Sequence, residues 1–252
     1  MGYCAVFLAL FVMLLPGGAR GASGDSPDPG QENVQLVDVQ SAHAFPRGTY
    51  SLGIRAVPSG GVIAALRVGV TDYVLVGLSY GAGNFVGSGE PTWDDRVEFD
   101  IKIRVAEEAG VIPSLAAGYD SRGFGPKLDH GGYEKASLGF YAVASKTLPF
   151  SEYWQLHAGV SRTMEEERAK PDIFVGATAR FSKEFSVLAE LQTAIEREDG
   201  SDESRIGYLN VGLRWVFMEE LELDLYFRNL VGPSESLELS SRSLAFVFYD
   251  SF

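Results

Sequence analysis

Apolar and polar residues alternate along most of the chain from about residue 47 to its last residue. The clearest example is Arg96–Val105, in which large apolar residues occupy one set of alternate positions and charged residues occupy the other. The apolar set is Val97, Phe99, Ile101, Ile103 and Val105, and the charged set is Glu98, Asp100, Lys102 and Arg104. Successive side chains of a β-strand point to opposite faces, so this period of two predicts a strand with one apolar and one charged face.

The same alternation recurs often enough to predict about twelve strands. The segments are 50–56, 64–70, 74–80, 96–105, 111–119, 137–145, 154–161, 173–180, 187–192, 208–215, 221–228 and 244–248. With their flanks most are roughly 9 to 11 residues long, which is the length that crosses a bilayer at a tilt, whereas strands of soluble proteins average nearer five or six. Strand length therefore favours a membrane barrel over a soluble secreted β protein, although the alternation would be the same in both.

Short and long connections alternate between these segments. Residues 71–72 form a short connection, 82–94 a long one, 107–110 a short one and 121–132 a long one. The later connections continue the alternation at 147–152, 164–170, 182–184, 196–204, 218–219 and 231–240, and only 58–61 is shorter than the scheme expects. Outer-membrane barrels have short periplasmic turns and longer external loops. The fold class predicted for residues 47–252 is therefore all-β, a transmembrane antiparallel up-and-down barrel of about 12 strands.

The N-terminal region has a different composition. Cys4–Leu15 is an apolar run of about twelve residues, too short to span a bilayer as a helix, and small residues at Ala19 and Gly21 suit cleavage. Residues 1–21 are predicted to be a cleaved signal peptide, which places the exported chain in the cell outer membrane. Residues 22–46 are rich in Gly, Pro, Asp and Gln and are predicted to be a flexible N-terminal segment.

Charge and cysteine content exclude several classes of function. The net charge is −13 and the pI is about 4.7, so the surface repels nucleic-acid phosphates. The only cysteine, Cys4, lies in the predicted leader, which leaves no disulfide or cysteine metal site in the mature chain. The three histidines, His43, His130 and His157, do not form a metal-binding spacing. We therefore expect no metal and no cofactor.

The polar face of the strands is expected to line the barrel lumen. The lumen-lining candidates are Arg55, Arg67, Glu98, Asp100, Lys102, Arg104, His157, Arg180, Glu190, Arg214, Glu222, Asp224 and Arg228. Charges removed from water must pair or stay hydrated, which leaves two interpretations. Salt bridges among these residues fill and close a narrow barrel, or an arginine track guides an acidic sugar through a pore. The first is favoured, because twelve strands leave little bore once arginines, tyrosines and Phe174 point inward.

Hydrolytic activity has little support in the sequence. An outer-membrane lipid hydrolase needs a serine beside a histidine. The next serine on the His157 face of its own strand is Ser161, four residues away, a separation of roughly 13 Å along a strand. The chain is therefore predicted not to be an enzyme.

Several segments resemble the barrels of YjbH-like outer-membrane proteins. They are Arg67–Gly81, Asn84–Gly89, Ile112–Asp120, Gly139–Lys146, Leu156–Val160 and Gly207–Trp215, so that the resemblance extends over about Arg47–Phe252. YjbH-like proteins are linked to exopolysaccharide production and have no established catalytic residues. The resemblance implies an outer-membrane barrel that is structural or accessory to envelope or exopolysaccharide handling.

The expected partners follow from this assignment. They are the lipid of the outer membrane, a polysaccharide, and the barrel-assembly machinery, which reads a C-terminal aromatic residue of the kind found at Phe252. No nucleic-acid partner is expected. The leading hypothesis is the non-enzymatic structural or accessory barrel, the alternative is a narrow channel for small anionic or saccharide solutes, and an outer-membrane lipid hydrolase ranks third.

Overall fold

The computed structural model describes residues 33–58, 60–87, 89–127, 132–165, 171–193, 207–217, 220–231 and 242–252. The predicted signal peptide, residues 1–21, lies outside the described residues, as does the first part of the predicted flexible segment. The strands are β1 Thr49–Val57, β2 Gly61–Thr71, β3 Val74–Gly83, β4 Thr92–Trp93, β5 Glu98–Ala106, β6 Ser114–Asp120, β7 Phe124–Lys127, β8 Tyr133–Lys135, β9 Gly139–Leu148, β10 Ser151–Arg162, β11 Asp172–Arg180, β12 Phe185–Gln192, β13 Tyr208–Phe217, β14 Leu221–Phe227 and β15 Arg242–Ser251.

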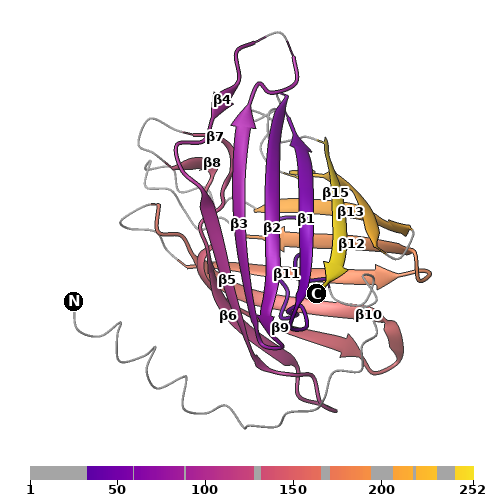
Figure 1. Cartoon of the computed structure of the whole chain (residues 1–252). Helices are drawn as coiled ribbons and strands as arrows, with labels where there is room; N and C mark the ends of the chain where they lie inside the picture. The colour runs from indigo at the N-terminus through magenta and orange to yellow at the C-terminus, as the bar shows by residue number, and fades with distance from the viewer. Residues whose placement is uncertain are drawn as a thin grey trace.

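Twelve of these strands form a closed antiparallel barrel (Figure 1). The barrel closes because β1 pairs with both β2 and β15: Leu52 is opposite Leu66 on one side and Phe248 on the other. The remaining barrel strands pair with their neighbours in chain order, apart from the steps that pass over β4 and the β7–β8 pair. The predicted all-β barrel of about 12 strands is confirmed.

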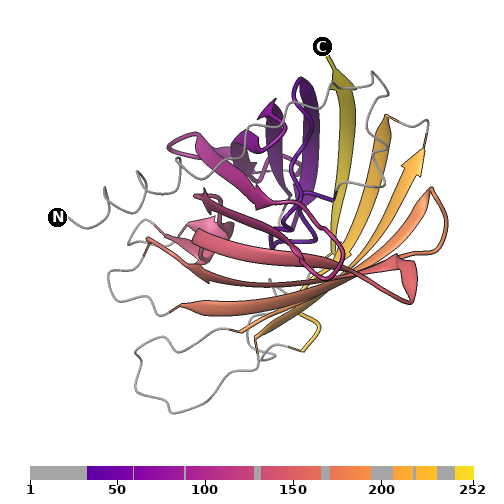
Figure 2. The same ribbon diagram turned by 90° about the horizontal axis from the view of Figure 1, so that it is seen from below.

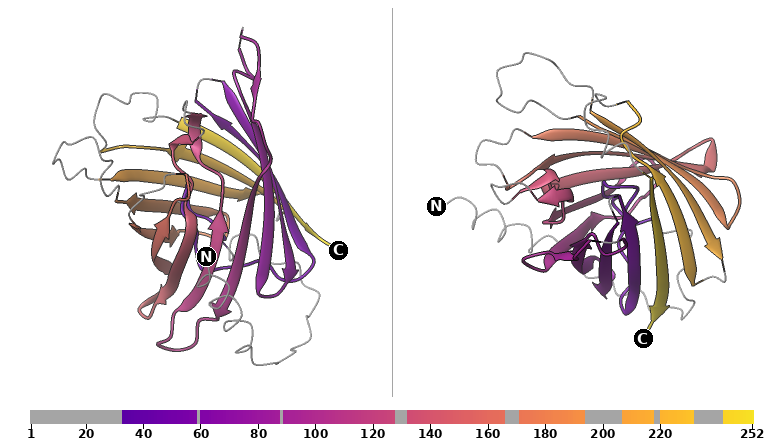
Figure 3. Two further views of the ribbon diagram at one scale, coloured as in Figure 1. Left: turned by 90° about the vertical axis from the view of Figure 1, so that its left-hand side faces the viewer. Right: turned by 90° about the horizontal axis from the view of Figure 1, so that it is seen from above.

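The two ends of the barrel differ in the length of their connections. At the end where β1 begins and β15 finishes, the strands are joined by 72–73, 107–113, 149–150, 181–184 and 218–220. We call this the turn end; in Figure 1 the turns that join β2 to β3 and β5 to β6 lie at the bottom, and those that join β9 to β10 and β11 to β12 lie at the right. The opposite, loop end carries longer connections except at 58–60, and β4 projects there beyond the barrel wall (Figure 3). The predicted alternation of short and long connections is therefore present.

The outward face of the barrel is apolar through the middle of the strands. Ile54 is 57% exposed and Phe246 is 50% exposed, values that would be unfavourable in water for a continuous belt of such residues. Aromatic pairs gather near both rims: Phe185 stacks on Trp215 near the turn end, and Tyr119 contacts Phe140 toward the loop end. A lipid-facing barrel has this arrangement, with an apolar band between two aromatic girdles. Among the described residues, no helix is long and apolar enough to cross a bilayer.

Three short strands were not expected from the sequence: β4 lies in the region predicted as a connection at 82–94, and the other two pair with each other. The region predicted as a loop at 121–132 contains β7, which pairs with β8 (Tyr133–Lys135). Phe124, Tyr133 and Lys135 of this pair are buried, so the pair folds into the loop end of the barrel instead of standing in solvent.

The N-terminal segment enters the barrel. Residues 33–46 were predicted to be part of a flexible segment, but in the structure most of them are buried between the walls, where the indigo trace lies in Figure 2. The backbone N–H of Leu36 donates to the Val39 carbonyl at 2.9 Å, and that of Ser41 donates to the Val34 carbonyl at 3.2 Å. These bonds make a reversing turn, and we call residues 33–46 the internal hairpin.

Apolar residues explain why the expectation fails for this stretch. The Gly- and Pro-rich composition of 22–46 belongs mainly to its first part, whereas the hairpin carries an aliphatic or aromatic residue at seven of its fourteen positions. Those residues are Val34, Leu36, Val37, Val39, Ala42, Ala44 and Phe45, and all are buried. Their burial supplies the hydrophobic free energy that a flexible tail would lack.

The hairpin forms the centre of three apolar clusters with the wall. Leu36, Val39 and Ala42 pack with Ala116, Leu138, Tyr141, Val143 and Phe174. Val34, Ala44 and Phe45 pack with Leu75 and Tyr249, and Val37 packs with Leu188, Tyr226 and Ala245. Gly176 on β11 makes room for this packing, because a Cβ atom there would lie 2.4 Å from Leu36 Cδ2.

Candidate functional site

All thirteen predicted lumen residues lie on the inward side of the barrel. Those that are buried are Glu98, Asp100, Lys102, His157, Glu190, Arg214, Glu222, Asp224 and Arg228, and those that are partly buried are Arg55, Arg67, Arg104 and Arg180. The strand alternation places them there, since their neighbours in sequence face outward. The structure divides most of them among separate clusters, each of which includes a residue of the internal hairpin.

The cluster near the turn end is built around Arg214. Its guanidinium donates to both oxygens of Asp224, at 2.8 and 2.9 Å, and its Nε lies 3.2 Å from a Glu222 oxygen. Arg214 Nη1 also donates to the side-chain oxygen of Asn33. Two wall carboxylates therefore satisfy this arginine, and the hairpin adds one neutral contact.

A second cluster lies between β2, β5 and β6. Arg67 donates to Asp100 at 3.1 Å and to the Gln35 side chain at 2.6 Å. Asp120, which was not among the predicted lumen-lining residues, accepts a bond from Gln40 Nε2 at 3.0 Å. The hairpin thus supplies amide side chains to a wall network that already contains both charges.

The third cluster, nearest the loop end, has a different charge balance. Asp38, at the tip of the hairpin, is paired with three cations of the wall and of β8. Lys135 Nζ lies 2.7 Å from Asp38 Oδ2, Arg228 Nη2 lies 2.8 Å from the same oxygen, and Arg55 Nη2 lies 3.0 Å from Oδ1. Among the described residues, Arg55, Lys135 and Arg228 all form their ion pairs with Asp38.

An aromatic ring lies between the cations of this cluster. The Phe124 ring centroid is 4.7 Å from the Arg55 guanidinium carbon and 4.8 Å from that of Arg228. Lys135 Nζ lies 5.9 Å from the same ring. Attraction between the cations and the ring face offsets part of their mutual repulsion, which allows three positive groups to share one carboxylate.

The tip of the hairpin is also held by an anion of the wall. The Glu190 carboxylate accepts backbone N–H bonds from Val37 and Asp38 at 3.0 Å and from Val39 at 3.1 Å. Asn210 Nδ2 donates to the same carboxylate at 2.7 Å. Glu190 therefore pairs with backbone amides rather than with the nearby cations.

Two hairpin side chains have shifted pKa values. Burial alone would raise the pKa of Asp38, but Arg228, Lys135 and Arg55 together hold it below its ordinary value of 3.8. Burial, with the positive charges of Lys102 and Arg104, lowers the pKa of His43 to about 4. At neutral pH the docked hairpin therefore carries one negative charge and a neutral histidine.

A serine does lie beside His157, although not the one considered from the sequence. Ser145 is opposite His157 in the β9–β10 register, and its Oγ is 2.7 Å from His157 Nδ1. The backbone N–H of Ala42 donates to the same Oγ at 2.9 Å, and both side chains are buried beneath the hairpin. This pair is enclosed and anchors the hairpin, so the geometry gives no support to hydrolysis.

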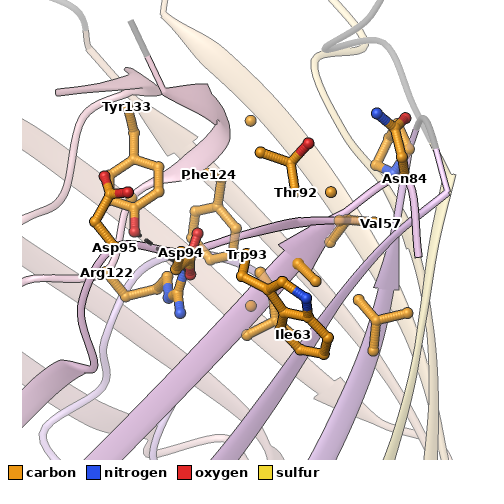
Figure 4. Close-up of a pocket in the computed structure, with 18 of the residues that line it drawn as sticks. Val57, Ile63, Asn84, Thr92, Trp93, Asp94, Asp95, Arg122, Phe124 and Tyr133 are labelled. Carbon is orange, nitrogen blue, oxygen red and sulfur yellow. Dashed lines mark hydrogen bonds and ion pairs between the residues drawn. The ribbon is translucent and has the colours of Figure 1, made fainter. Parts of the chain in front are cut away.

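A cavity of about 520 Å³ lies at the loop end above the third cluster (Figure 4). Trp93, Thr92 and Asn84 line it on one side, and Arg122, Tyr133 and Phe124 line it on the other. Arg228, which forms an ion pair with Asp38, also lines the cavity. We call this cavity the vestibule.

A polar network shapes one wall of the vestibule. Arg122 Nη1 donates to Asp94 at 2.7 Å and to the Tyr133 hydroxyl at 3.2 Å, and Tyr133 donates to Glu98 at 3.0 Å. Sequence reasoning missed Arg122 and Asp94 because they lie in loops, where no alternation indicates which side chains point inward. Among the described residues, no group of histidine, cysteine and carboxylate side chains could hold a metal ion.

Comparison with known proteins finds similarity in fold only. No protein-family model matches the chain, and no curated protein matches it. A solved KdgM porin superposes with a TM-score of 0.50 at 8% identity, covering 81% of this chain and 99% of the porin. A KdgM porin in complex with disordered oligogalacturonate gives 0.49 at 7% identity, with the same coverage of each chain. A mutant of the Rh. blastica porin gives 0.35 at 13% identity, covering 76% of this chain and 55% of that one. The barrel therefore has a porin-type fold, and the YjbH-like resemblance is not confirmed.

Proposed function

We propose that the chain is an outer-membrane channel for small saccharide or anionic solutes, and that the internal hairpin holds it closed in the conformation seen here. The turn end would face the periplasm and the loop end the exterior, as in other barrels with short and long connections. The observation that carries the proposal is that a polar lumen is filled by a segment that is not part of the barrel wall.

The wall does not need the hairpin in order to stay closed. Each of the twelve barrel strands is hydrogen-bonded to a barrel strand on both sides, and the β1–β15 pairing completes the ring. The hairpin makes no ladder with any of them, and it is held by side-chain contacts, ion pairs and apolar packing. Its withdrawal would therefore leave every backbone pair of the wall intact, which a membrane requires.

The lining groups favour polar solutes of modest size. The vestibule combines an exposed indole at Trp93 with charged and hydroxyl groups such as Arg122 and Thr92. Below it lie the cations Arg55 and Arg228. A path with such groups suits a hydroxylated or anionic solute, because each polar group of the solute finds a partner as its hydration shell is removed.

The second candidate is a closed barrel with a structural or accessory role in envelope or exopolysaccharide handling, as the YjbH-like resemblance implies. The extensive contacts of the hairpin favour it, since a segment in three apolar clusters is strongly held. The two candidates differ in one property: a channel opens when the hairpin is weakened, whereas a closed accessory barrel does not conduct.

Asp38→Asn separates them. The substitution leaves three cations without their carboxylate, and breaking a buried ion pair in this way costs about 3 to 5 kcal/mol. Asp250→Asn is the matched control, because Asp250 lies at the exposed rim and accepts a bond from Tyr50. Proteoliposomes with each variant would be tested by swelling in isotonic glucose, after heat-modifiable gel mobility has shown that the barrel is folded.

We expect Asp38→Asn to increase the glucose-dependent swelling rate at least tenfold over that of the wild type, with Asp250→Asn unchanged. A folded Asp38→Asn barrel that is no more permeable than the wild type would refute the channel proposal and favour the accessory barrel. Equal increases in both variants would also refute it, because the effect would then not depend on the hairpin.

A further inference from the structure

The cluster at the hairpin tip has the composition of a ligand site. We propose that Arg55, Lys135 and Arg228 form a binding site for the carboxylate of an acidic sugar, and that Asp38 is a tethered occupant of that site. The inference rests on the proposed function in one respect, that the hairpin can leave the barrel. It adds the chemical class of the solute and the means by which that solute competes with the hairpin.

Charge balance distinguishes this cluster from the others. Arg214 is satisfied by two wall carboxylates and Arg67 by Asp100, so both keep their ionic partners when the hairpin leaves. The ion pairs of Arg55, Lys135 and Arg228 go to Asp38 alone among the described residues. Withdrawal would leave these three cations without Asp38 and the wall carboxylate Glu190 without its hairpin amides, so the site would keep an excess of two positive charges. Unpaired buried charges are costly, so an external anion would be stabilised there.

The geometry around Asp38 is that of a carboxylate receptor. One oxygen faces Lys135 and Arg228 while the other faces Arg55, so the two oxygens are contacted from different sides. Arg228 directs both Nε and Nη2 at the same oxygen, at 3.0 and 2.8 Å. Guanidinium groups recognise planar anions with fixed directions, so this arrangement selects a carboxylate more strongly than a neutral hydroxyl.

The vestibule gives a reason for expecting a sugar behind the carboxylate. Arg228 and Phe124 belong both to the cluster and to the vestibule lining, so a carboxylate in the site places the rest of the solute in the vestibule. There the Tyr133 ring, the Thr92 hydroxyl and the Asn84 amide line the space. A flat aromatic face beside hydroxyl partners suits a pyranose ring, which has apolar C–H faces and polar edges.

Competition follows from the shared site. A solute that binds only when Asp38 has left stabilises the withdrawn hairpin, and the equilibrium shifts in proportion to the solute concentration over its dissociation constant. An acidic sugar would in this way open its own path, whereas a neutral sugar would not.

Equilibrium binding to the purified full-length barrel in detergent tests the site. Asp38→Asn leaves the cations without their internal carboxylate, so isothermal titration with sodium glucuronate should give a dissociation constant at least tenfold lower than that of the wild type. Arg228→Gln added to Asp38→Asn should weaken binding at least tenfold. Arg67→Gln added to Asp38→Asn is the matched control, since Arg67 pairs with Asp100, and it should leave binding unchanged.

Glucose and acetate separate the two halves of the proposal. Glucose should bind the Asp38→Asn barrel at least tenfold more weakly than glucuronate, and so should acetate. Equal affinity for glucose and glucuronate would overturn the carboxylate site, and equal affinity for acetate would overturn the sugar assignment. Equal losses from Arg228→Gln and Arg67→Gln would show that general charge, rather than this site, attracts the anion.

A second measurement covers the case in which Asp38→Asn does not fold. Ala42→Cys keeps Asp38 and places a thiol in the buried hairpin, so glucuronate should accelerate its labelling by a maleimide at least threefold while glucose does not. No acceleration would overturn the tethered-occupant proposal. If glucose permeates the Asp38→Asn barrel but glucuronate does not bind, the carboxylate site is refuted and the proposed channel function is retained. If glucuronate binds but no solute permeates, the channel function is refuted and the carboxylate site is retained.

Discussion

Acidification should open the barrel through His43. The ring lies in the internal hairpin, and its Nε2 is buried without a hydrogen-bond partner in the described structure. The charged and titratable groups around it are Lys102, Arg104, Glu108 and His157. Burial and the two cations lower the pKa of His43 to about 4, whereas a withdrawn, hydrated hairpin would restore the ordinary value of 6.5.

Proton linkage gives the direction and the size of this effect of pH on hairpin docking. Between pH 6.5 and pH 4 the withdrawn hairpin binds a proton that the docked hairpin does not, so docking weakens as the pH falls through that window. The difference reaches about 2 kcal/mol at pH 5, a shift of roughly 20-fold in the ratio of withdrawn to docked hairpin relative to pH 7. Asp38 does not change hairpin docking in this pH range. Its pKa is held below 3.8, so the stabilisation from its ion pairs is lost only at lower pH.

Single-channel recording in planar bilayers measures this shift directly. The ratio of open to closed time should increase roughly 20-fold between pH 7 and pH 5 for the wild type. His43→Gln, which cannot be protonated, should change less than threefold over the same range. The reasoning is wrong if His43→Gln keeps the full pH dependence, or if acidification closes the wild-type channel.

Two further substitutions test how the hairpin is held. Gly176→Ala puts a Cβ 2.4 Å from Leu36 Cδ2, and such overpacking costs about 1 to 3 kcal/mol, so it should raise the open-channel fraction at least fivefold. Gly53→Ala, whose Cβ would meet its nearest atom at 3.7 Å, should have no effect, and equal effects at both glycines would contradict the packing described for Leu36. Glu190→Gln removes the charge that accepts three hairpin amides and should increase protease cleavage of the hairpin in the folded barrel; unchanged cleavage would show that the tip is held without it.

The barrel could be predicted from the sequence because in each of its strands successive side chains alternate between the apolar outward face and the polar inward face. Alternation identified the inward face, and Arg214, Asp224 and Glu190 do point inward. It could not identify partners across strands, because the register is set by closure of the whole sheet. Ser145 and His157 are twelve positions apart in sequence and yet form a hydrogen bond. Within the strand of His157 alone, the period of two points to Ser161 as the next serine on the same face.

The hairpin and the vestibule could not be predicted in the same way. Asp38 belongs to no strand, and nothing in its neighbourhood in the sequence indicates that Lys135 or Arg228 will meet it. The composition of 22–46 as a whole predicts flexibility because of its Gly and Pro residues, which lie mainly before residue 33. The apolar residues from Val34 to Phe45 are the sequence feature that indicates burial, since flexible solvent-exposed segments contain few apolar side chains.

The central claim is that the internal hairpin closes a channel, and a reversible cross-link tests it most directly. The double variant Ala42→Cys, Ser145→Cys places two thiols close enough for a disulfide, because the Ala42 nitrogen is 2.9 Å from Ser145 Oγ. The two single-cysteine variants are the controls. Planar-bilayer conductance of the oxidised double variant at pH 5 should be absent. After reduction, openings should appear at the frequency of the single-cysteine variants. Conductance that persists with the disulfide formed would show that solutes pass without hairpin withdrawal, and a barrel that stays silent after reduction would show that it is not a channel.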